Sequence, residues 1–274
     1  MGVGYTTIMY DPAEVLSEGL GDFAACRYDG VELGLGKVEY IGVDSLQESL
    51  EEHGLDIYCV MAGWLNNEED VDAAVDGAGI AAELNARFLG ILPPPRGQTD
   101  DATFDEWLDR ICTAADEAGV TPVIHHHGAS KIESPEEIEE WLERAPDNLE
   151  LLYDTAHYQP YGDVIDGIHR FADDIAYVHL KDIDPTVDFQ NHVDTLSAGN
   201  VQYDSLFVFL TSFVDLGDGV IDFEAVDEAL DEIGYDGQIT IEIENERDDR
   251  LVHAKRNIDH WTDATDATDA SAGR

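Results

Sequence analysis

Eight short runs of apolar and β-branched residues alternate with longer amphipathic stretches along the 274 residues of the chain. This alternation is typical of parallel strands joined by crossover helices. Because no change of composition marks an internal boundary, residues 1–261 are predicted to form one α/β domain, a single (β/α)₈ TIM barrel. The eight strands are expected at Val3–Tyr10, Tyr28–Leu33, Leu55–Met61, Arg87–Leu92, Thr121–His125, Leu149–Asp154, Ile175–Leu180 and Gln238–Ile243.

Two helix signals lie between these strands. Apolar residues recur at helical spacing from Phe104 to Ala115, which predicts a helix between the fourth and fifth strands. Ser134 followed by Pro135, with Glu137 three residues after the serine, is the pattern of a helix N-terminus. The first of these helices is expected to cover the barrel.

Two stretches break the alternation. The segment from Ile183 to Asp222 separates the seventh strand from the last helix and strand, and within it Tyr203–Phe213 has a helical pattern. A connection of this length in a compact domain is usually a lid or a binding element. Residues 262–274 repeat a Thr-Asp-Ala triplet without apolar periodicity. They are expected to form a disordered acidic low-complexity tail.

The charge of the chain restricts its partners and its surroundings. Asp and Glu outnumber Lys and Arg by 61 to 14, and the acid is spread over every segment. Such a surface would repel itself at low ionic strength, so we expect a high-salt cytoplasm of a halophile, where the Debye length is short. Nucleic acid is not expected as a partner, because no cluster of Lys or Arg is present to neutralise phosphates.

Neither a long apolar run nor a paired cysteine motif occurs in the sequence. We therefore expect no membrane partner and three reduced thiols, which agrees with a cytoplasmic protein. A homo-oligomer is compatible with the sequence. The expected partner is a small molecule.

Polar side chains directly follow the last four strand runs. In a parallel barrel the active site forms at the C-terminal ends of the strands, and alternate residues of a strand share a face. Three of these strands therefore present a polar pair on one face. The pairs are His125 with His127, His179 with Lys181, and Glu242 with Glu244, while the sixth run ends in Asp154 with His157 three residues later.

These strand ends indicate a metal site. A lone histidine at a strand end is more often structural, but here four adjacent strand ends all offer imidazole or carboxylate. This combination suits a divalent ion such as Mn²⁺, Co²⁺ or Zn²⁺ rather than a soft thiophilic metal. Lys181 is one of only four lysines in the chain. A surface lysine after a strand would be the ordinary interpretation, but in a lysine-poor chain we favour a functional one.

The same stretches resemble the xylose isomerase-like barrels and, within them, the inosose dehydratases. The resemblance covers roughly residues 28–260. It rests on Tyr28–Leu33, the triple histidine 125–127, Leu151–His157, Val178–Ile183, Gly217–Phe223 and Ile241–Glu244. The sequence departs from the dehydratase pattern at Gly4–Thr7, Pro93–Arg96, Gly128–Ser130 and Ala156, so specificity is expected to differ more than chemistry.

The resemblance implies one divalent metal ion held by four side chains. The superfamily places Glu, Asp, His and Glu around its metal, which carries over to Asp154, His179 and Glu242. His125 stands where the first Glu would be, as in the dehydratase branch. Mn²⁺ is the first expectation for the ion, with Co²⁺, Zn²⁺ and Mg²⁺ as alternatives.

The function implied is that of a metal-dependent hydro-lyase, which removes water from a keto-inositol or a similar polyhydroxylated β-hydroxy ketone. Lys181, His157 or Glu244 would take the proton beside the carbonyl, while another of them or His127 would protonate the departing hydroxyl. The sequence leaves the order of these roles open.

Three other functions stay in view. The first is a sugar or keto-acid isomerase or epimerase, which would use the same metal and an enediolate. The second is a protein without catalytic activity, either a sugar-binding barrel or an assembly protein. A metal-dependent abasic-site endonuclease would need a larger ligand cluster and a positive groove, neither of which the sequence shows.

Overall fold

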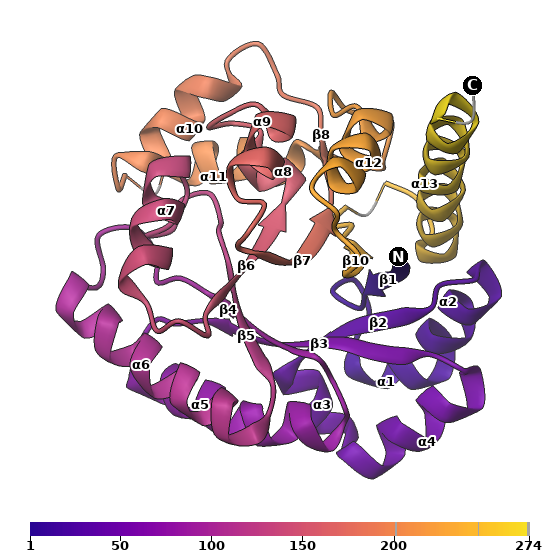
Figure 1. Ribbon diagram of the computed structural model, residues 1–274, viewed down its shortest axis with the longest axis horizontal. Helices are drawn as coiled ribbons and strands as arrows, with labels where there is room; N and C mark the ends of the chain where they lie inside the picture. The colour runs from indigo at the N-terminus through magenta and orange to yellow at the C-terminus, as the bar shows by residue number, and fades with distance from the viewer. Residues whose placement is uncertain (201, 246, 273–274) are drawn as a thin grey trace.

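The computed structural model describes residues 1–200, 202–245 and 247–272. Eight parallel strands close into a barrel in the order β1-β10-β7-β6-β5-β4-β3-β2 (Figure 1). This confirms the predicted (β/α)₈ barrel. The barrel strands are β1 (Gly2–Thr6), β2 (Gly30–Gly34), β3 (Asp56–Trp64), β4 (Phe88–Leu92), β5 (Thr121–His125), β6 (Glu150–Asp154), β7 (Ile175–Leu180) and β10 (Gln238–Ile241).

The first strand ends earlier than predicted. Its extension to Tyr10 is prevented by a turn, in which the amide of Tyr10 donates to the carbonyl oxygen of Thr7 at 3.0 Å. Pro12 then begins α1, since a proline is readily accepted at the first helical position. The third strand is longer than predicted and runs on to Trp64.

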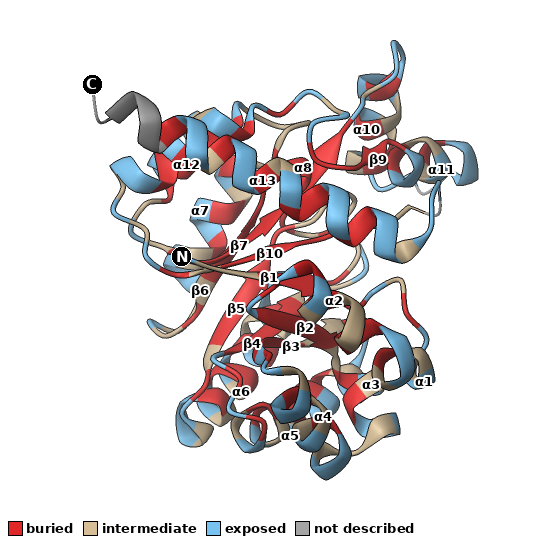
Figure 2. Ribbon diagram, turned by 90° about the vertical axis from the view of Figure 1, so that its right-hand side faces the viewer, coloured by how far each residue is buried: buried red, intermediate tan, exposed pale blue. Residues whose placement is uncertain are grey.

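Helices surround the barrel and turn their buried faces toward it (Figure 2). The predicted helix around Phe104 is α6, and Ser134 forms the predicted capping box at the start of α7. The helices are α1 (Pro12–Glu14), the π-helical turn Val15–Gly19, α2 (Leu20–Cys26), α3 (Leu35–Ile41), α4 (Val43–His53), α5 (Glu68–Glu83), α6 (Asp101–Ala118), α7 (Pro135–Arg144), α8 (Thr155–Tyr158), α9 (Val164–Arg170), α10 (Phe189–Ser197), α11 (Tyr203–Thr211), α12 (Phe223–Glu232) and α13 (Arg250–Ala272).

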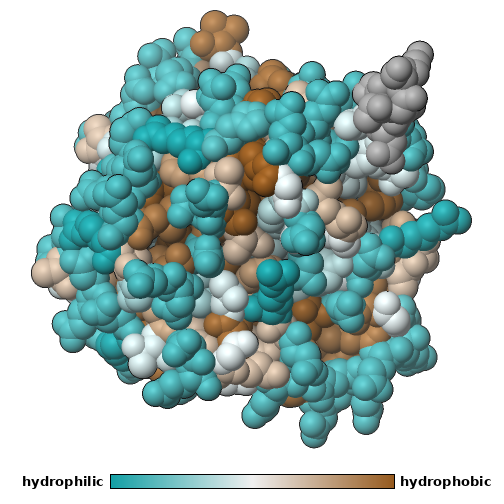
Figure 3. Space-filling view, in the orientation of Figure 1, coloured by the Kyte–Doolittle hydropathy of each residue, from teal (hydrophilic) through white to brown (hydrophobic). Residues whose placement is uncertain are grey.

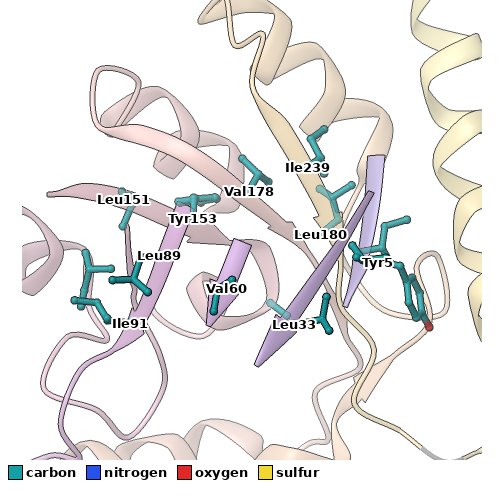
Figure 4. Close-up of a cluster of buried hydrophobic side chains, with 14 of the residues drawn as sticks. Tyr5, Leu33, Val60, Leu89, Ile91, Leu151, Tyr153, Val178, Leu180 and Ile239 are labelled. Carbon is teal, nitrogen blue, oxygen red and sulfur yellow. The ribbon is translucent and has the colours of Figure 1, made fainter. Parts of the chain in front are cut away.

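Alternation along each strand separates two apolar layers. One set of side chains, which includes Tyr5, Leu33 and Ile239 (Figure 4), belongs to the large core between strands and helices. Tyr5, for example, packs against Phe23 of α2 at 5.0 Å between ring centroids. The residues between them point into the barrel, where a smaller apolar cluster fills its interior. That cluster consists of Tyr58, Cys59, Phe88, Val123, Leu152 and Tyr177. Beyond this cluster, the next inward-facing residue of each strand lies at the C-terminal end of the barrel, which we call its mouth.

The long segment after β7 folds over this mouth. It contains α10, α11 and a two-stranded antiparallel sheet of β8 (Asp182–Ile183) and β9 (Phe213–Val214). Helix α11 confirms the predicted helical pattern in this segment. Phe209 and Phe213 lie 5.7 and 5.1 Å from the ring of His157, centroid to centroid. The segment thus covers part of the barrel end that carries the polar strand ends.

The C-terminal residues differ from the predicted disordered tail. Helix α13 continues to Ala272, which corrects the expectation for residues 262–272, while residues 273–274 lie outside the described part. Trp261, Ala264 and Thr268 are buried at helical spacing. Ala264 and Thr268 follow Trp261 three and seven residues later, so the three side chains share one helix face, while Thr262 and Ala267 are exposed.

The surface agrees with the acidic composition. Hydrophilic side chains dominate the face seen in Figure 3, with smaller apolar patches between them. Within the described residues, no helix is both long and apolar enough to cross a membrane.

Candidate metal centre and active site

Four buried side chains converge at the C-terminal ends of β5, β6, β7 and β10. They are the four residues proposed as metal ligands, and one ligand atom from each lies within 4.8 Å of the others. His125 Nε2 is 3.5 Å from Asp154 Oδ2, and His179 Nδ1 is 3.4 Å from Glu242 Oε2. The structure therefore brings the predicted set together, although metal binding itself stays a prediction.

Hydrogen bonds outside the cluster orient its ligand atoms. His125 donates from Nδ1 to the carbonyl oxygen of His126 at 2.7 Å, which leaves Nε2 facing the cluster. His179 donates from Nε2 to Oε2 of Glu32 at 2.8 Å, which leaves Nδ1 facing it. Asp154 accepts from the amide of His157 with Oδ1 and turns Oδ2 inward. Such outer partners commonly fix the tautomer and direction of metal-binding histidines.

Two of the inward atoms lack hydrogen-bond partners among the described residues. Asp154 Oδ2 and His179 Nδ1 are both buried in this state. A buried polar atom without a partner is costly, and a carboxylate oxygen is especially so. A cation at their meeting point would satisfy both atoms. The donor set of two imidazoles and two carboxylates fits a divalent ion of intermediate hardness.

The charges in the cluster stabilise one another. Burial disfavours the charged form of Glu242, but Lys181 and His179 outweigh it and hold the pKa of that carboxyl well below its ordinary value. Burial likewise opposes ionisation of Asp154, yet His125 and Lys181 lower its pKa. Both carboxylates are therefore ionised, as metal ligands must be.

The four proposed catalytic residues form a second layer above the cluster. Lys181 is only 1% exposed, which contradicts a surface position. Its Nζ donates to Oε2 of Glu242 at 3.1 Å and also to Glu244, and lies 3.4 Å from Nε2 of His157. The ring of His127 lies 3.8 Å from that of His157, centroid to centroid. All four therefore border one space beside the candidate metal centre.

Burial and charge set the protonation of this second layer. Burial lowers the pKa of His127 to about 3, and burial with the neighbouring His127 and Lys181 places the pKa of His157 well below its ordinary value. Burial would also lower the pKa of Lys181, but Glu242 and Glu244 outweigh it and raise that pKa. The layer therefore combines neutral imidazoles with a cationic ammonium group.

A cavity of about 390 Å³ opens onto both layers. A larger hollow of about 880 Å³ lies against α13, and none of its lining residues lines the 390 Å³ cavity. The cavity is lined by Thr6, Thr7, Ile8, Glu32, Gly34, Lys37, Met61, Trp64, Leu92, His125, His127, His157, Lys181, Glu242 and Glu244. Six of the eight proposed residues line it, and Asp154 and His179 are buried immediately behind them.

Sequence reasoning gave no role to Glu32 or to the cavity residues of the first strands. Glu32 stands between the apolar residues Val31 and Leu33 of a strand run, which is the signal that could have singled it out. Its partner His179 is 147 positions away. The middle histidine, His126, accepts the amide of Asp154 at its Nε2 and does not join the cluster.

Comparison with known proteins identifies the family of the chain. The profile of the xylose isomerase-like TIM barrel family matches residues 20–265. The chain belongs to this family. An inosose dehydratase of Lacticaseibacillus casei is 34% identical over 180 residues, covering 61% of this chain and 57% of that protein. The chain thus matches little more than half the length of that member of the family. An inosose dehydratase of Geobacillus kaustophilus is 28% identical over 263 residues, covering 86% and 81%.

Solved structures share the fold. The crystal structure of IOLI protein with a binding zinc atom superposes with a TM-score of 0.73 at 18% identity, covering 98% of both chains. A D-tagatose 3-epimerase-like protein superposes with a TM-score of 0.74 at 21% identity, covering 99% of this chain and 100% of the other.

Proposed function

We propose that the chain is a metal-dependent hydro-lyase that removes water from a keto-inositol or a similar polyhydroxylated β-hydroxy ketone. The observation that carries the proposal is the buried convergence of His125, Asp154, His179 and Glu242 beneath a cavity that also holds Lys181. The curated relatives, which are named inosose dehydratase, support the same reaction.

The proposed metal site takes one divalent ion, with Mn²⁺ as the first choice and Co²⁺, Zn²⁺ and Mg²⁺ as alternatives. The placement is supported by Oδ2 of Asp154 and Nδ1 of His179, which have no hydrogen-bond partner among the described residues. The IOLI protein, which shares the fold and was crystallised with a binding zinc atom, is consistent with a divalent ion in such a barrel. When bound, the ion would supply Lewis-acid polarisation of a substrate carbonyl.

The side chains above the metal site would move the protons. His157 is a buried neutral imidazole and would accept the proton from the carbon beside the carbonyl, with His127 packed against it. Lys181 is cationic and would donate a proton to the departing hydroxyl, so that the carbon–oxygen bond breaks and water leaves. The 3.4 Å between His157 Nε2 and Lys181 Nζ would let the abstracted proton return to the lysine. Glu244 would hold the ammonium group in place.

A sugar isomerase or epimerase is the second candidate. It would use the same metal and an enediolate, and would return the abstracted proton to a carbon of the substrate instead of expelling water. Glu242 and Glu244, together on one strand end, keep this reaction available. The fold shared with a D-tagatose 3-epimerase-like protein is compatible with it.

Proton NMR in D₂O would separate the candidates. Metal-loaded protein would be mixed with an inosose or with a ketohexose. Dehydration removes a hydroxylated carbon, so the signals of the protons on such carbons decrease and those of a new product appear. Isomerisation or epimerisation keeps the number of hydroxylated carbons. Unchanged spectra for every inosose and ketohexose, with metal bound, would contradict both reactions and favour a binding protein.

A further inference from the structure

We propose that Thr6, Thr7 and Lys37 form a subsite that binds the hydroxyl groups of the substrate and selects among polyhydroxylated compounds. The inference rests on the proposed function, because it assigns recognition to the same cavity. It concerns the β1–β2 side of the cavity, which holds none of the proposed metal ligands or acid–base groups.

Thr6 and Thr7 carry buried hydroxyl groups whose hydrogen bonds are not formed within the described part of the protein. The two residues are 2% and 1% exposed, and both line the cavity. Neither Oγ1 has a hydrogen-bond partner in the described part of the chain. A buried hydroxyl without a partner is uncommon and costs stability, so its presence beside a cavity points to a ligand that supplies the missing bond.

The register places Thr6 at the level of the candidate metal centre. Thr6 pairs with Glu32 on β2, and Tyr5 pairs with Ile241 on β10, so Thr6 lies between the inward carboxylates Glu32 and Glu242. In the closed order of the barrel, β1 lies opposite β5. The Thr6 hydroxyl therefore faces the cavity from the side opposite His125.

Lys37 adds a positive donor to these hydroxyls. It stands on α3, and its Nζ donates to the carbonyl oxygens of Thr7 and Ile8, which fastens it beside the end of β1. An ammonium group has three donors, so one is left for an oxygen in the cavity. Burial lowers the pKa of Lys37, while Asp11 opposes that shift.

The surroundings of Lys37 are unusual in a chain this acidic. Among the described residues, no carboxylate lies within 4.0 Å of its Nζ, whereas the other three lysines each have such a partner. Those pairs are Lys131 with Asp101, Lys181 with Glu242 and Glu244, and Lys255 with Asp259. The chain has 61 acidic residues, so a cavity lysine with no ion-pair partner among the described residues is suited to a ligand oxygen.

The combined surface fits a polyol. Three donors on the β1–β2 side would bind neighbouring hydroxyl groups, and the adjoining wall of Met61, Trp64 and Leu92 offers apolar contact to the carbon–hydrogen face of a ring. The strand Gly4–Thr7 is also one of the stretches in which the sequence departs from the dehydratase pattern. Thr6 and Thr7 are therefore placed to determine which hydroxyl arrangement is accepted.

Calorimetric titration of the metal-loaded protein with myo-inositol tests this subsite without turnover, because myo-inositol has the ring hydroxyls but no ketone. Thr6→Val and Thr7→Val should each raise Kd about fivefold, and Lys37→Met about tenfold or more, because hydrogen bonds to a charged donor are the stronger ones. Thr6→Ser and Thr7→Ser keep the hydroxyl and should bind within about twofold of the parent. Metal content should be unchanged in all five variants.

Thr113→Val and Lys255→Met are the matched controls, since both positions are exposed and outside the cavity. The subsite is refuted if the parent does not bind myo-inositol in the millimolar range, if the valine variants bind like the parent, or if serine weakens binding as much as valine does. A protein that binds the ring polyol through these residues but does not dehydrate any inosose would contradict the proposed reaction and support the subsite.

Discussion

The two halves of the barrel mouth differ in how their polar groups are used. On the half formed by β5, β6, β7 and β10, imidazoles and carboxylates meet one another and the ammonium group of Lys181. On the half formed by β1–β4, the hydroxyls of Thr6 and Thr7 face the same cavity without partners among the described residues, beside an apolar wall. The first half is organised for charge, the second for recognition.

Glu32 connects the two halves. It belongs to β2, yet its carboxylate accepts from Nε2 of His179 on β7. Chemistry should therefore depend on the strand ends from β5 onward and on Glu32, whereas selectivity should depend on the first strands. Substitutions on either side of this division are expected to have separable effects, of which the loss of a metal ligand is the largest.

Removing a carboxylate from the charged half should abolish the centre. Asp154 presents to the cluster a buried oxygen that has no hydrogen-bond partner in the described part of the chain, so Asp154→Ala should lose both the metal ion and all activity. Metal content by mass spectrometry and product formation by NMR are the measurements. Stoichiometric metal retained with the parent's affinity would refute the assignment of Asp154 as a ligand.

Removing the ammonium group should impair turnover and spare metal binding. Lys181→Met should reduce kcat by roughly 10² or more, the usual scale for losing a general acid or base, with metal content and folding unchanged. Lys255→Met, whose lysine is exposed on α13, is the control and should have little effect. If the Lys181 variant turns over substrate within about twofold of the parent, the lysine is not part of the chemistry.

The connecting residue should act through the metal. Glu32→Gln removes a charge that orients His179, so metal affinity should fall roughly 10- to 100-fold, as for other outer partners of metal ligands. Activity at saturating metal should largely recover. Glu39→Gln, on the exposed surface of α3, is the control. Equal metal affinities in the parent and in Glu32→Gln would show that Glu32 does not act through the metal, and would assign it to substrate recognition instead.

Salt should change the stability of the protein mainly through its acidic surface, and least through the barrel mouth. Folding is expected to require molar salt, because a net charge of −47 opposes the compact state unless it is screened. The melting temperature should rise steeply between about 0.1 M and 3 M KCl, over which the Debye length falls from roughly 10 Å to under 3 Å. A constant melting temperature over that range would count against a halophilic surface.

The charged half was far easier to predict from the sequence than the recognition half. Apolar strand runs end at or beside His125, Asp154, His179 and Glu242, and a parallel barrel brings such ends together whatever loops intervene. Thr6 and Thr7 carry no comparable signal, because threonine is common in strands and only the structure shows that their hydroxyls lack partners among the described residues.

Two other features lay beyond local pattern. The bond from Glu32 to His179 joins residues 147 positions apart, so neither strand run indicates it. The triplet repeat of the C-terminus has too few large apolar residues to predict a helix. Packing of Ala264 and Thr268 against the rest of the molecule, visible only in three dimensions, accounts for the helical continuation of α13.

One divalent ion is expected to lie among His125, Asp154, His179 and Glu242. Anomalous X-ray scattering from crystals of the protein loaded with Mn²⁺ tests it most directly. We expect one ion per chain, with ligand atoms from all four side chains at about 2.0–2.3 Å. Crystals with no ion at this position, or with an ion held by other side chains, would contradict it.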